Sequence, residues 1–287
     1  MSVASVKFQV ASDEGGLRLD QVIPKHVDGL SRRKARAVID LGGVFVDRTR
    51  VKIAGRLVHA GQTIEVNVGG ALDRANETPL VPTIVHVDDH LIIADKPAGL
   101  VTAPTPESDR GDLLDQLKHQ FGEVYLVHRI DLPTSGLLVF ARTRDANKRL
   151  GDAFKEHAVE REYRAVAIGE VTEQTIDREI DGRRAVTHVK PLEALVGATL
   201  ISARLETGRT HQIRIHLAGI GHPVAGDPQH GGDTVRTFTP RAPRLVLHAA
   251  VLGFVHPSTG EHVRWESPLP ADLDAWVTRI SRAITNT

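Results

Sequence analysis

The 287-residue sequence contains no cysteine, and this absence removes several kinds of site. Without thiols the chain cannot carry a disulfide framework, a zinc-thiolate centre or a cysteine nucleophile. No apolar run approaches the roughly 20 residues that a membrane-spanning helix needs. The first fifteen residues include Asp13 and Glu14 and lack the basic and apolar regions of a secretory signal. These absences favour a cytoplasmic protein that is not inserted in a membrane.

Net charge is also absent overall, because 36 Lys and Arg residues balance 36 Asp and Glu residues. Between residues 31 and 58, however, the chain carries eight basic residues and two acidic ones, an excess of six positive charges. Such a segment is either a footprint for the phosphates of a nucleic acid or a solvated charged face. The length allows a sizeable core and more than one domain.

The basic segment has the pattern of a small helix-and-strand domain. Ser31 can cap a helix in which Ala35, Val38 and Ile39 share one face, and the pair Gly42 and Gly43 ends it. The segments VFVD and QTIEV then alternate as short strands, with a turn around Arg48 and Thr49 between them. We therefore expect a small basic domain over residues 1–70.

Residues 71–82 lack apolar periodicity and contain Gly, Asn and Pro, which predicts a linker. Residues 83–287 form a second, larger domain with long strand-like stretches and few intervening helices. This pattern predicts an α+β fold with a mixed, largely antiparallel sheet and flanking helices. Helices are expected at residues 113–121, 145–157, after Thr210, and at 271–284.

The segment VHRIDLPTSGLLVFARTR, residues 127–144, places charges directly before a wholly apolar run. Such a cluster is expected at the lip of a core. Arg129 beside Asp131 can keep that carboxylate ionised, which makes Asp131 a candidate nucleophile or electrostatic stabiliser. The alternative is a turn aspartate that bonds its own backbone, with Thr134 and Ser135 as further turn residues.

A second cluster, TGRTHQIRIHLAGIGHPVAGD over residues 207–227, is rich in Arg and His. Thr210 can cap a helix in which Ile213, Leu217 and Ile220 share one face, although the string also alternates as a strand would. Arg214 then lies near the helix N-terminus, where it can hold a phosphate or the carboxylate of Asp131.

Two other interpretations of these clusters fail. The histidines of this region are His211, His216, His222 and His230. They lack the i, i+4 ligand pair with an intervening Glu, so the pattern does not favour a metal site. The HRID segment is not a kinase catalytic loop, because its Asp is displaced by one residue and the chain lacks a phosphate-cradling glycine loop and a D-F-G segment.

Taken together, the motifs resemble those of the RluA-type pseudouridine synthases. The resemblance covers nearly the whole chain, and the N-terminal segment is similar to the small RNA-binding domain of the ribosomal protein S-four type. It rests on five ordered matches: DKPAGLVTAP (95–104), HRIDLPTSGLLVFART (128–143), REYRAVAIG (161–169), GRTHQIRIHLAGIGHPVAGD (208–227) and LHAAVLGFVHPSTGEHVRWESPLP (247–270).

The resemblance implies the pseudouridine synthase fold and isomerisation of chosen uridines in RNA to pseudouridine, without cofactor or metal. In that reaction the uracil leaves the ribose at N1, rotates while held, and rejoins through C5. Asp131 matches the catalytic aspartate of the family and Arg214 its basic partner. Tyr163 matches the aromatic residue that packs on the uracil, and Arg129 an arginine associated with displacing the target base. The chemistry agrees, since a carboxylate stabilises positive character at C1′ and stacking on Tyr163 helps a flipped base.

Further residues are predicted to bind the substrate RNA. In the larger domain they are His128, Arg129, Thr134, Arg209 and Ile213, and in the basic domain Arg32, Arg33 and Arg36. The sequence departs from the family at Leu132 and Pro133, where a charged pair is frequent. It departs again at Ala103 and Pro104, which replace His-Pro, and at His230, where tyrosine is common. These changes affect RNA-contacting loops and no catalytic position.

Three hypotheses remain. The leading one is an RNA pseudouridine synthase acting on structured RNA, with ribosomal RNA preferred to tRNA as the substrate, working as a cytoplasmic monomer. The second is an RNA-binding protein without catalysis, in which the larger domain is a scaffold. The third is an enzyme that cleaves small glycosides, and the separate basic domain argues against it.

Overall fold

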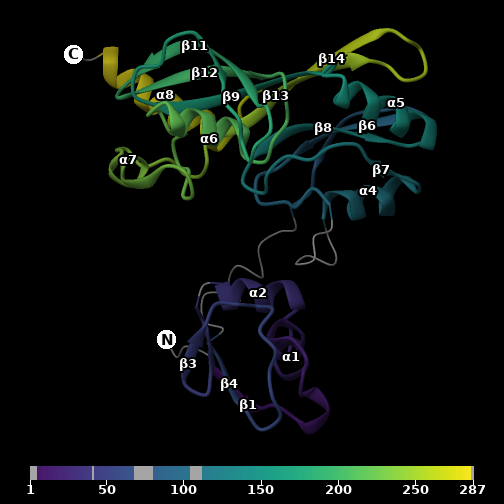
Figure 1. The fold of residues 1–287 in the computed structure, drawn as a ribbon, viewed down its shortest axis with the longest axis vertical. Coiled ribbons are helices and arrows are strands. Elements are labelled where there is room, and N and C mark those ends of the chain that lie inside the picture. Colours follow the sequence, from purple (N-terminus) through teal and green to yellow (C-terminus); the bar gives the residue numbers. More distant parts are fainter. Residues whose placement is uncertain (1–4, 41, 68–79, 104–111, 286–287) are drawn as a thin grey trace. The chain divides into compact units, whose positions relative to one another are not determined.

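The computed structural model describes residues 5–40, 42–67, 80–103 and 112–285. These residues form two compact units, one before Leu80 and the other from Leu80 onward (Figure 1). Each unit has its own sheet and its own hydrophobic core. Of the predicted linker 71–82, residues 71–79 lie outside the described residues, so the domain boundaries at residues 70 and 83 stay predictions.

Within the described residues, the first unit contains a four-stranded antiparallel sheet in the order β1-β4-β2-β3 and two α-helices. Its elements are β1 (Ser5–Gln9), the 3-10 helix η1 (Ser12–Glu14), α1 (Leu19–His26), α2 (Arg32–Asp40), β2 (Val44–Val46), β3 (Thr49–Val51) and β4 (Thr63–Asn67). The two residues at the turn between β2 and β3, Asp47 and Arg48, have positive φ. The turn therefore lies one residue earlier than the sequence predicted, because Thr49 already pairs with Val46.

Helix α2 follows the predicted pattern. The Lys34 backbone N–H donates to Ser31 Oγ at 3.3 Å, which satisfies one of the free donors at the helix start. The apolar face of α2, Ala35, Val38 and Ile39, is buried in the core of the first unit. The basic side chains of α2 therefore occupy the remaining positions of this short helix.

The second unit contains a ten-stranded sheet with helices on both faces. Its elements are β5 (Thr83–Val87), β6 (Leu91–Lys96), α4 (Leu113–Phe121), β7 (Tyr125–Leu126), β8 (Ser135–Ala141), α5 (Arg144–Lys155), β9 (Glu160–Ile168), β10 (Gln174–Asp177), β11 (Val186–Leu195), β12 (Ala198–Leu205), α6 (Gln212–Gly219), α7 (Gly232–Thr237), β13 (Leu247–Val255), β14 (His262–Glu266) and α8 (Ala271–Thr285). The helices predicted at 113–121, 145–157 and 271–284 correspond to α4, α5 and α8.

The strand order is β10-β11-β12-β9-β13-β8-β6-β5, with β14 paired to β13 and β7 paired to β8. Strands β8 and β13 run parallel where Ser135 and Gly136 meet His248 and Ala249. The other strand pairs of this sheet, within the described residues, are antiparallel. The prediction of an α+β fold with a mixed, largely antiparallel sheet is confirmed.

The alternation of buried side chains divides the helices between the two faces of this sheet. Helices α4 and α6 pack on one face, against clusters that include Leu138 of β8 and Ala165 of β9. Helices α5 and α8 pack on the other face, against clusters that include Val139 and Val166. Tyr163 of β9 contacts both clusters of the first face, so it lies at the seam between them.

Gly136 makes the approach of β8 to β13 possible. Its φ is 119°, and a Cβ at this position would lie 2.3 Å from the carbonyl oxygen of Ala249. A side chain cannot occupy that space, so only glycine allows the two strands to meet here. The close approach fixes where β8 begins, and with it the loop that carries Asp131.

Helix α6 confirms the helical interpretation of residues 207–227, with one correction. The helix runs over Gln212–Gly219, and its N-cap is His211, with φ of 56°, rather than the predicted Thr210. The hydroxyl near this end that bonds Gln212 belongs to Thr207, which donates to Gln212 Oε1 at 2.8 Å. Among the described residues no helix is long and apolar enough to cross a membrane.

Candidate active site

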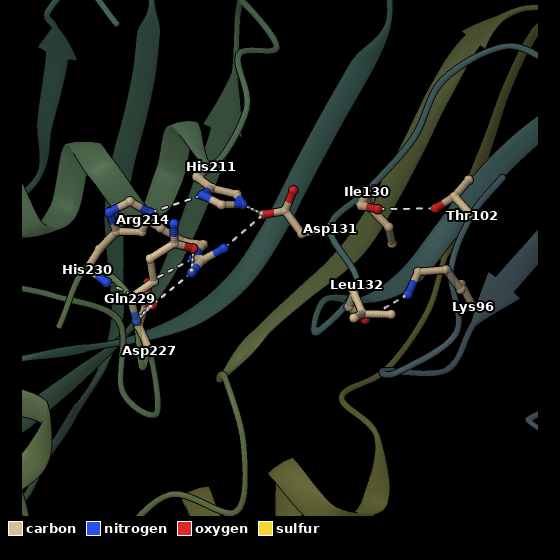
Figure 2. A network of polar contacts seen from close by, with 10 residues as sticks. All are labelled: Lys96, Thr102, Ile130, Asp131, Leu132, His211, Arg214, Asp227, Gln229 and His230. Atoms are coloured by element: carbon tan, nitrogen blue, oxygen red, sulfur yellow. Dashed lines mark hydrogen bonds and ion pairs between the residues drawn. The ribbon is translucent and has the colours of Figure 1, made fainter. Parts of the chain in front are cut away.

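Asp131 lies in the loop between β7 and β8, and its backbone is held on both sides. The carbonyl of Ile130 accepts a hydrogen bond from Thr102 Oγ1 at 3.1 Å (Figure 2). The carbonyl of Leu132 accepts from Lys96 Nζ at 3.3 Å and from the Gly99 N–H at 2.8 Å. These bonds fix the aspartate backbone independently of what its side chain contacts.

The loop also contains the turn that the alternative interpretation of Asp131 requires. The Thr134 N–H donates to the carbonyl of Asp131 at 3.1 Å, which closes a turn over Leu132 and Pro133. The Asp131 carboxylate itself contacts other residues, since Oδ2 lies 3.4 Å from Arg214 Nη1 and 3.8 Å from His211 Nε2. Within the described residues Oδ1 has no hydrogen-bond partner, and the side chain is 22 % exposed.

Lys96 is fully buried and bonds backbone carbonyls. Its Nζ donates to Leu100 at 2.8 Å, to Pro97 at 3.1 Å and to Leu132. Burial lowers the pKa of Lys96 to about 7, although the charge of Asp131 opposes that shift. The lysine therefore ties the segment after β6 to the loop that carries Asp131.

Arg214 of α6 joins two carboxylates. Its Nε and Nη2 each donate to one oxygen of Asp227 at 2.8 Å, which leaves Nη1 for Asp131 (Figure 2). Burial alone would raise the pKa of Asp227, but hydrogen bonds from Arg214 and from the N–H groups of Gln229 and His230 hold it below its usual value. The arginine is thus oriented by a carboxylate that stays charged, and its free end points at Asp131.

Tyr163 lies in β9, paired with Ala203 of β12 and Ala249 of β13. Its ring is partly buried between the clusters of α4 and α6. Burial raises its pKa to about 12, and the charge of Asp131 adds to the increase. The phenol therefore stays neutral at physiological pH and lies close enough to Asp131 for the charge of the carboxylate to act on it.

Arg129 does not act on Asp131 as the sequence spacing suggested. Its side chain is exposed, and no contact with Asp131 occurs among the described residues. The partners of the carboxylate, Arg214 and His211, come from a segment about eighty residues further along the chain. The hypothesis that Arg129 keeps Asp131 ionised is therefore replaced by a long-range contact.

The other predicted RNA-binding residues of this unit have different surroundings. The His128 ring stacks on Phe154 at 4.5 Å and its Nε2 accepts from the Val139 N–H. Burial lowers the pKa of His128 to about 3, so this ring is neutral. Ile213 is buried in the core cluster beneath α6. None of these contacts brings either residue to the Asp131 carboxylate.

Arg209 and Thr134 differ in their exposure to solvent. The Arg209 Nε donates to the carbonyl of Arg184 at 3.0 Å, and the residue is half-buried. Thr134 is buried, and its hydroxyl has no hydrogen-bond partner among the described residues. Their predicted contacts with RNA stay predictions.

In the first unit the three predicted arginines separate by burial. Arg36 is buried and forms an ion pair with the fully buried Asp20, to which Arg32 Nε also lies at 3.4 Å. Arg33 is exposed. The structure thus gives Arg36 a core contact, and the exposed cations of the basic segment 31–58 are Arg33, Arg48, Arg50, Lys52 and Arg56.

Sequence reasoning did not select Lys96, Thr102 or Asp227 as site residues. All three lie inside the motifs that carried the family resemblance. The feature of the sequence that could have indicated them is that each is a polar residue beside an apolar strand or a glycine turn. Gly226, whose φ is 75°, precedes Asp227, and a Cβ there would meet the Arg244 carbonyl at 2.0 Å. No pattern in one sequence tells which of these polar residues is buried.

The histidines of the second cluster are dispersed. His216 bonds Thr187 and the carbonyl of Arg178, and His222 bonds the carbonyl of Ile168. His211 and His230 bond each other. In the part of the chain that the structure describes, no group of three or more His, Asp, Glu or Cys side chains is arranged to hold a metal ion.

Chemically, the site offers one partly exposed carboxylate with a free oxygen, a buried cation behind it and a neutral phenol beside it. A single carboxylate of this kind can stabilise positive character at a sugar C1′ by charge or by a covalent bond. An aromatic surface can hold an extruded base by stacking.

Comparisons with known proteins agree with this chemistry. A family model described as RNA pseudouridylate synthase matches residues 90–219, and one described as S4 domain matches residues 17–64. A Nitrosomonas europaea protein named ribosomal large subunit pseudouridine synthase D is 36% identical over 96% of this chain and 88% of its own length. The Escherichia coli K12 protein of the same name is 33% identical over 92% of this chain and 90% of its own.

A solved structure titled human RNA pseudouridylate synthase domain containing 1 aligns with a TM-score of 0.58 and 25% identity. It covers 73% of this chain and 97% of the human chain. Fold, site and relatives define the protein as an RNA-modifying enzyme, as predicted. The chain belongs to the RluA-type family of RNA pseudouridine synthases, with an N-terminal S4 domain. Neither the non-catalytic RNA-binding hypothesis nor the glycoside-cleaving hypothesis finds support in these relatives.

Proposed function

We propose that this protein isomerises specific uridines of large-subunit ribosomal RNA to pseudouridine, with Asp131 as the catalytic residue. The observation that carries this proposal is the Asp131 carboxylate. Its backbone is fixed by Thr102 and Lys96, its Oδ2 faces Arg214, and its Oδ1 has no partner among the described residues. A carboxylate held this way is oriented but available to react.

In the proposed reaction the target uridine first leaves the RNA helix, at a cost of a few kcal/mol. Asp131 then stabilises C1′ as the N1–C1′ bond breaks. The uracil rotates while it is held against Tyr163 and forms the C5–C1′ bond. The proton lost from C5 is balanced by one gained at N1, so the product is an isomer of the substrate. Stacking on Tyr163 offsets part of the flipping cost, by about 1 to 3 kcal/mol.

Arg214 supports Asp131 without being consumed. Since Asp227 already occupies two of its nitrogens, the guanidinium cannot swing fully onto Asp131. It places one donor, Nη1, at 3.4 Å from Asp131 Oδ2. Arg129 and Arg209 are proposed to contact the RNA, because their guanidinium groups lie on exposed or half-buried residues of this unit. RNA binding by His128, Thr134 and Ile213 stays a prediction.

The first unit is proposed to hold the RNA backbone. The exposed cations of its basic segment, Arg33, Arg48, Arg50, Lys52 and Arg56, outnumber the two acidic residues of that segment. Phosphate contacts of this kind position an RNA without reading its sequence. The proposal includes a cytoplasmic monomer, because the relatives are named for ribosomal RNA and because Asp131, Arg214 and Tyr163 all come from one chain.

The test is a site-resolved pseudouridine assay on purified protein. Large-subunit ribosomal RNA fragments and a tRNA pool are incubated separately with the wild-type protein and with Asp131→Asn. We expect conversion of specific uridines in the ribosomal RNA by the wild type only. Conversion of the tRNA pool alone would reject the proposed substrate, and turnover by Asp131→Asn would reject the proposed catalytic residue.

A further inference from the structure

Behind the Asp131 carboxylate lie two histidines in series. His211 Nε2 is 3.8 Å from Asp131 Oδ2, and His211 Nδ1 is 3.0 Å from His230 Nε2 (Figure 2). The two rings meet edge to face, with centroids 5.2 Å apart. Each nitrogen of His211 is therefore directed at a polar partner, so the position of one proton affects both contacts.

The tautomers follow from these contacts. A neutral imidazole has one N–H donor and one acceptor nitrogen. If His211 presents its Nε2–H to the negatively charged Asp131, its Nδ1 is an acceptor. His230 must then donate its Nε2–H to His211. With the opposite tautomer, a lone pair on His211 would face the carboxylate and repel it.

The backbone of His211 is set for this position at some cost. Its φ of 56° lies in the left-handed region, which is unfavourable for a residue with a side chain. It is the N-cap of α6, but its side chain makes no cap bond to the described residues of that helix. The imidazole is thus directed away from the helix end and toward Asp131 and His230.

The charges that face this pair come from three segments. Asp131 belongs to the loop before β8, Arg214 to α6, and Asp227 to the turn that follows it. Burial lowers the pKa of His230, and the positive charge of Arg214 adds to that decrease, while Asp227 and Asp131 oppose it. His230 is therefore a neutral donor at physiological pH.

We propose that His211 and His230 form a positioning pair for the catalytic carboxylate, in which His230 donates to His211 and His211 thereby presents an N–H to Asp131. The inference rests on the proposed function, since it assumes that Asp131 is the reacting group. Neither histidine needs to touch the substrate. His230 acts only through His211.

The first test compares two variants of similar size, His230→Gln and His230→Met, in single-turnover kinetics. Glutamine can donate to His211 Nδ1 and methionine cannot. We expect His230→Met to lower the maximal rate about tenfold with little change in the RNA concentration for half of it. His230→Gln should restore most of that loss. Equal rates for the two variants would overturn the proposal.

The second test needs no activity. Long-range ¹H–¹⁵N spectra of the wild-type protein with ¹⁵N-labelled histidine report the tautomer of each ring, with assignment from the His211→Gln spectrum. We expect the proton of neutral His211 on Nε2. A proton on Nδ1 instead would overturn the proposal even if His230→Met fails to fold.

If the wild type forms no pseudouridine, the proposed function fails, whereas the tautomer measurement still decides the geometry of the pair.

Discussion

Asp20 and Asp131 both contact arginine, but they differ in how many arginines they contact and in how exposed they are. Asp20 is fully buried and lies beside Arg36, Arg18 and Arg32. Burial alone would raise its pKa, but the hydrogen bonds from Arg36 and Arg18 hold it below its usual value. Asp131 is 22 % exposed and has one arginine contact at 3.4 Å. One carboxylate is saturated by its partners and the other is left partly free.

The difference lies in how the arginines are occupied. Arg36 is directed at Asp20 from within the core of the first unit. Arg214 is directed first at Asp227, which takes two of its nitrogens, and only the third reaches Asp131. The structural carboxylate of Asp20 thus has arginines directed at it, whereas Asp131 shares an arginine that another carboxylate already holds in place. The predictions below separate these two roles.

The largest effect is expected from exchanging each aspartate for asparagine. Asp131→Asn should lower the single-turnover rate by about 10⁴-fold or more, because the amide can neither attack nor carry charge. Its thermal unfolding should match that of the wild type. Asp20→Asn should instead unfold the first unit at lower temperature while the rate at saturating RNA changes much less. The same loss of rate in both variants would remove the distinction.

Asp227→Asn tests whether the second carboxylate organises the site. Removing one partner of a buried ion pair costs about 3 to 5 kcal/mol of unfolding free energy, which denaturant titration measures. Because the folded-state pKa of Asp227 is lowered, its stabilisation is present above the unfolded value near 4 and is lost as the pH falls through the folded value. The variant should therefore lose less stability than the wild type as the pH falls below about 4. An equal loss of unfolding free energy in acid for the variant and the wild type would show that Asp227 does not organise its ion pair with Arg214.

Arg36 and Arg33, three residues apart on α2, offer a matched comparison. Arg36→Gln should lower the unfolding free energy of the first unit by about 3 kcal/mol, since it leaves a buried carboxylate with fewer partners. Arg33→Gln should leave stability within about 0.5 kcal/mol, as an exposed substitution does. Both are measured by chemical denaturation of the full chain. A larger loss for Arg33→Gln would contradict the assignment of Arg36 to the core.

The smallest expected effect is on the salt dependence of RNA binding. Replacing the exposed Arg33, Arg50 and Lys52 with Gln should reduce the slope of log affinity against log salt by about 0.7 to 0.9 for each phosphate that is no longer neutralised. The rate at saturating RNA should change less than the RNA concentration for half of it. The control replaces the exposed Lys148, Arg149 and Lys155 of α5. Equal slopes for the two triple variants would place the RNA footprint elsewhere.

Local patterns in the sequence were sufficient to predict several elements. The apolar spacing and Ser31 predicted α2, and the apolar pattern of residues 113–121, 145–157 and 271–284 predicted α4, α5 and α8. The long alternating stretches with few helices predicted the sheet type. These features depend on neighbours a few residues away, so one sequence contains the information. The start of α6 did not follow this rule, because His211 takes a left-handed conformation at the position after the predicted cap.

The sequence alone thus determined the class of protein, its α+β architecture and the aspartate on which the proposed mechanism depends. Only the tertiary structure decided which cation that aspartate contacts. Arg129 is two residues from Asp131 but lies apart from it, whereas Arg214 is brought to it when α6 packs on the sheet beside β9. The tertiary structure also decided that Arg36 is buried, that Asp227 holds Arg214, and that His211 and His230 meet. Contacts between distant segments depend on strand order and close approaches such as that of Gly136 to Ala249, which local spacing does not encode.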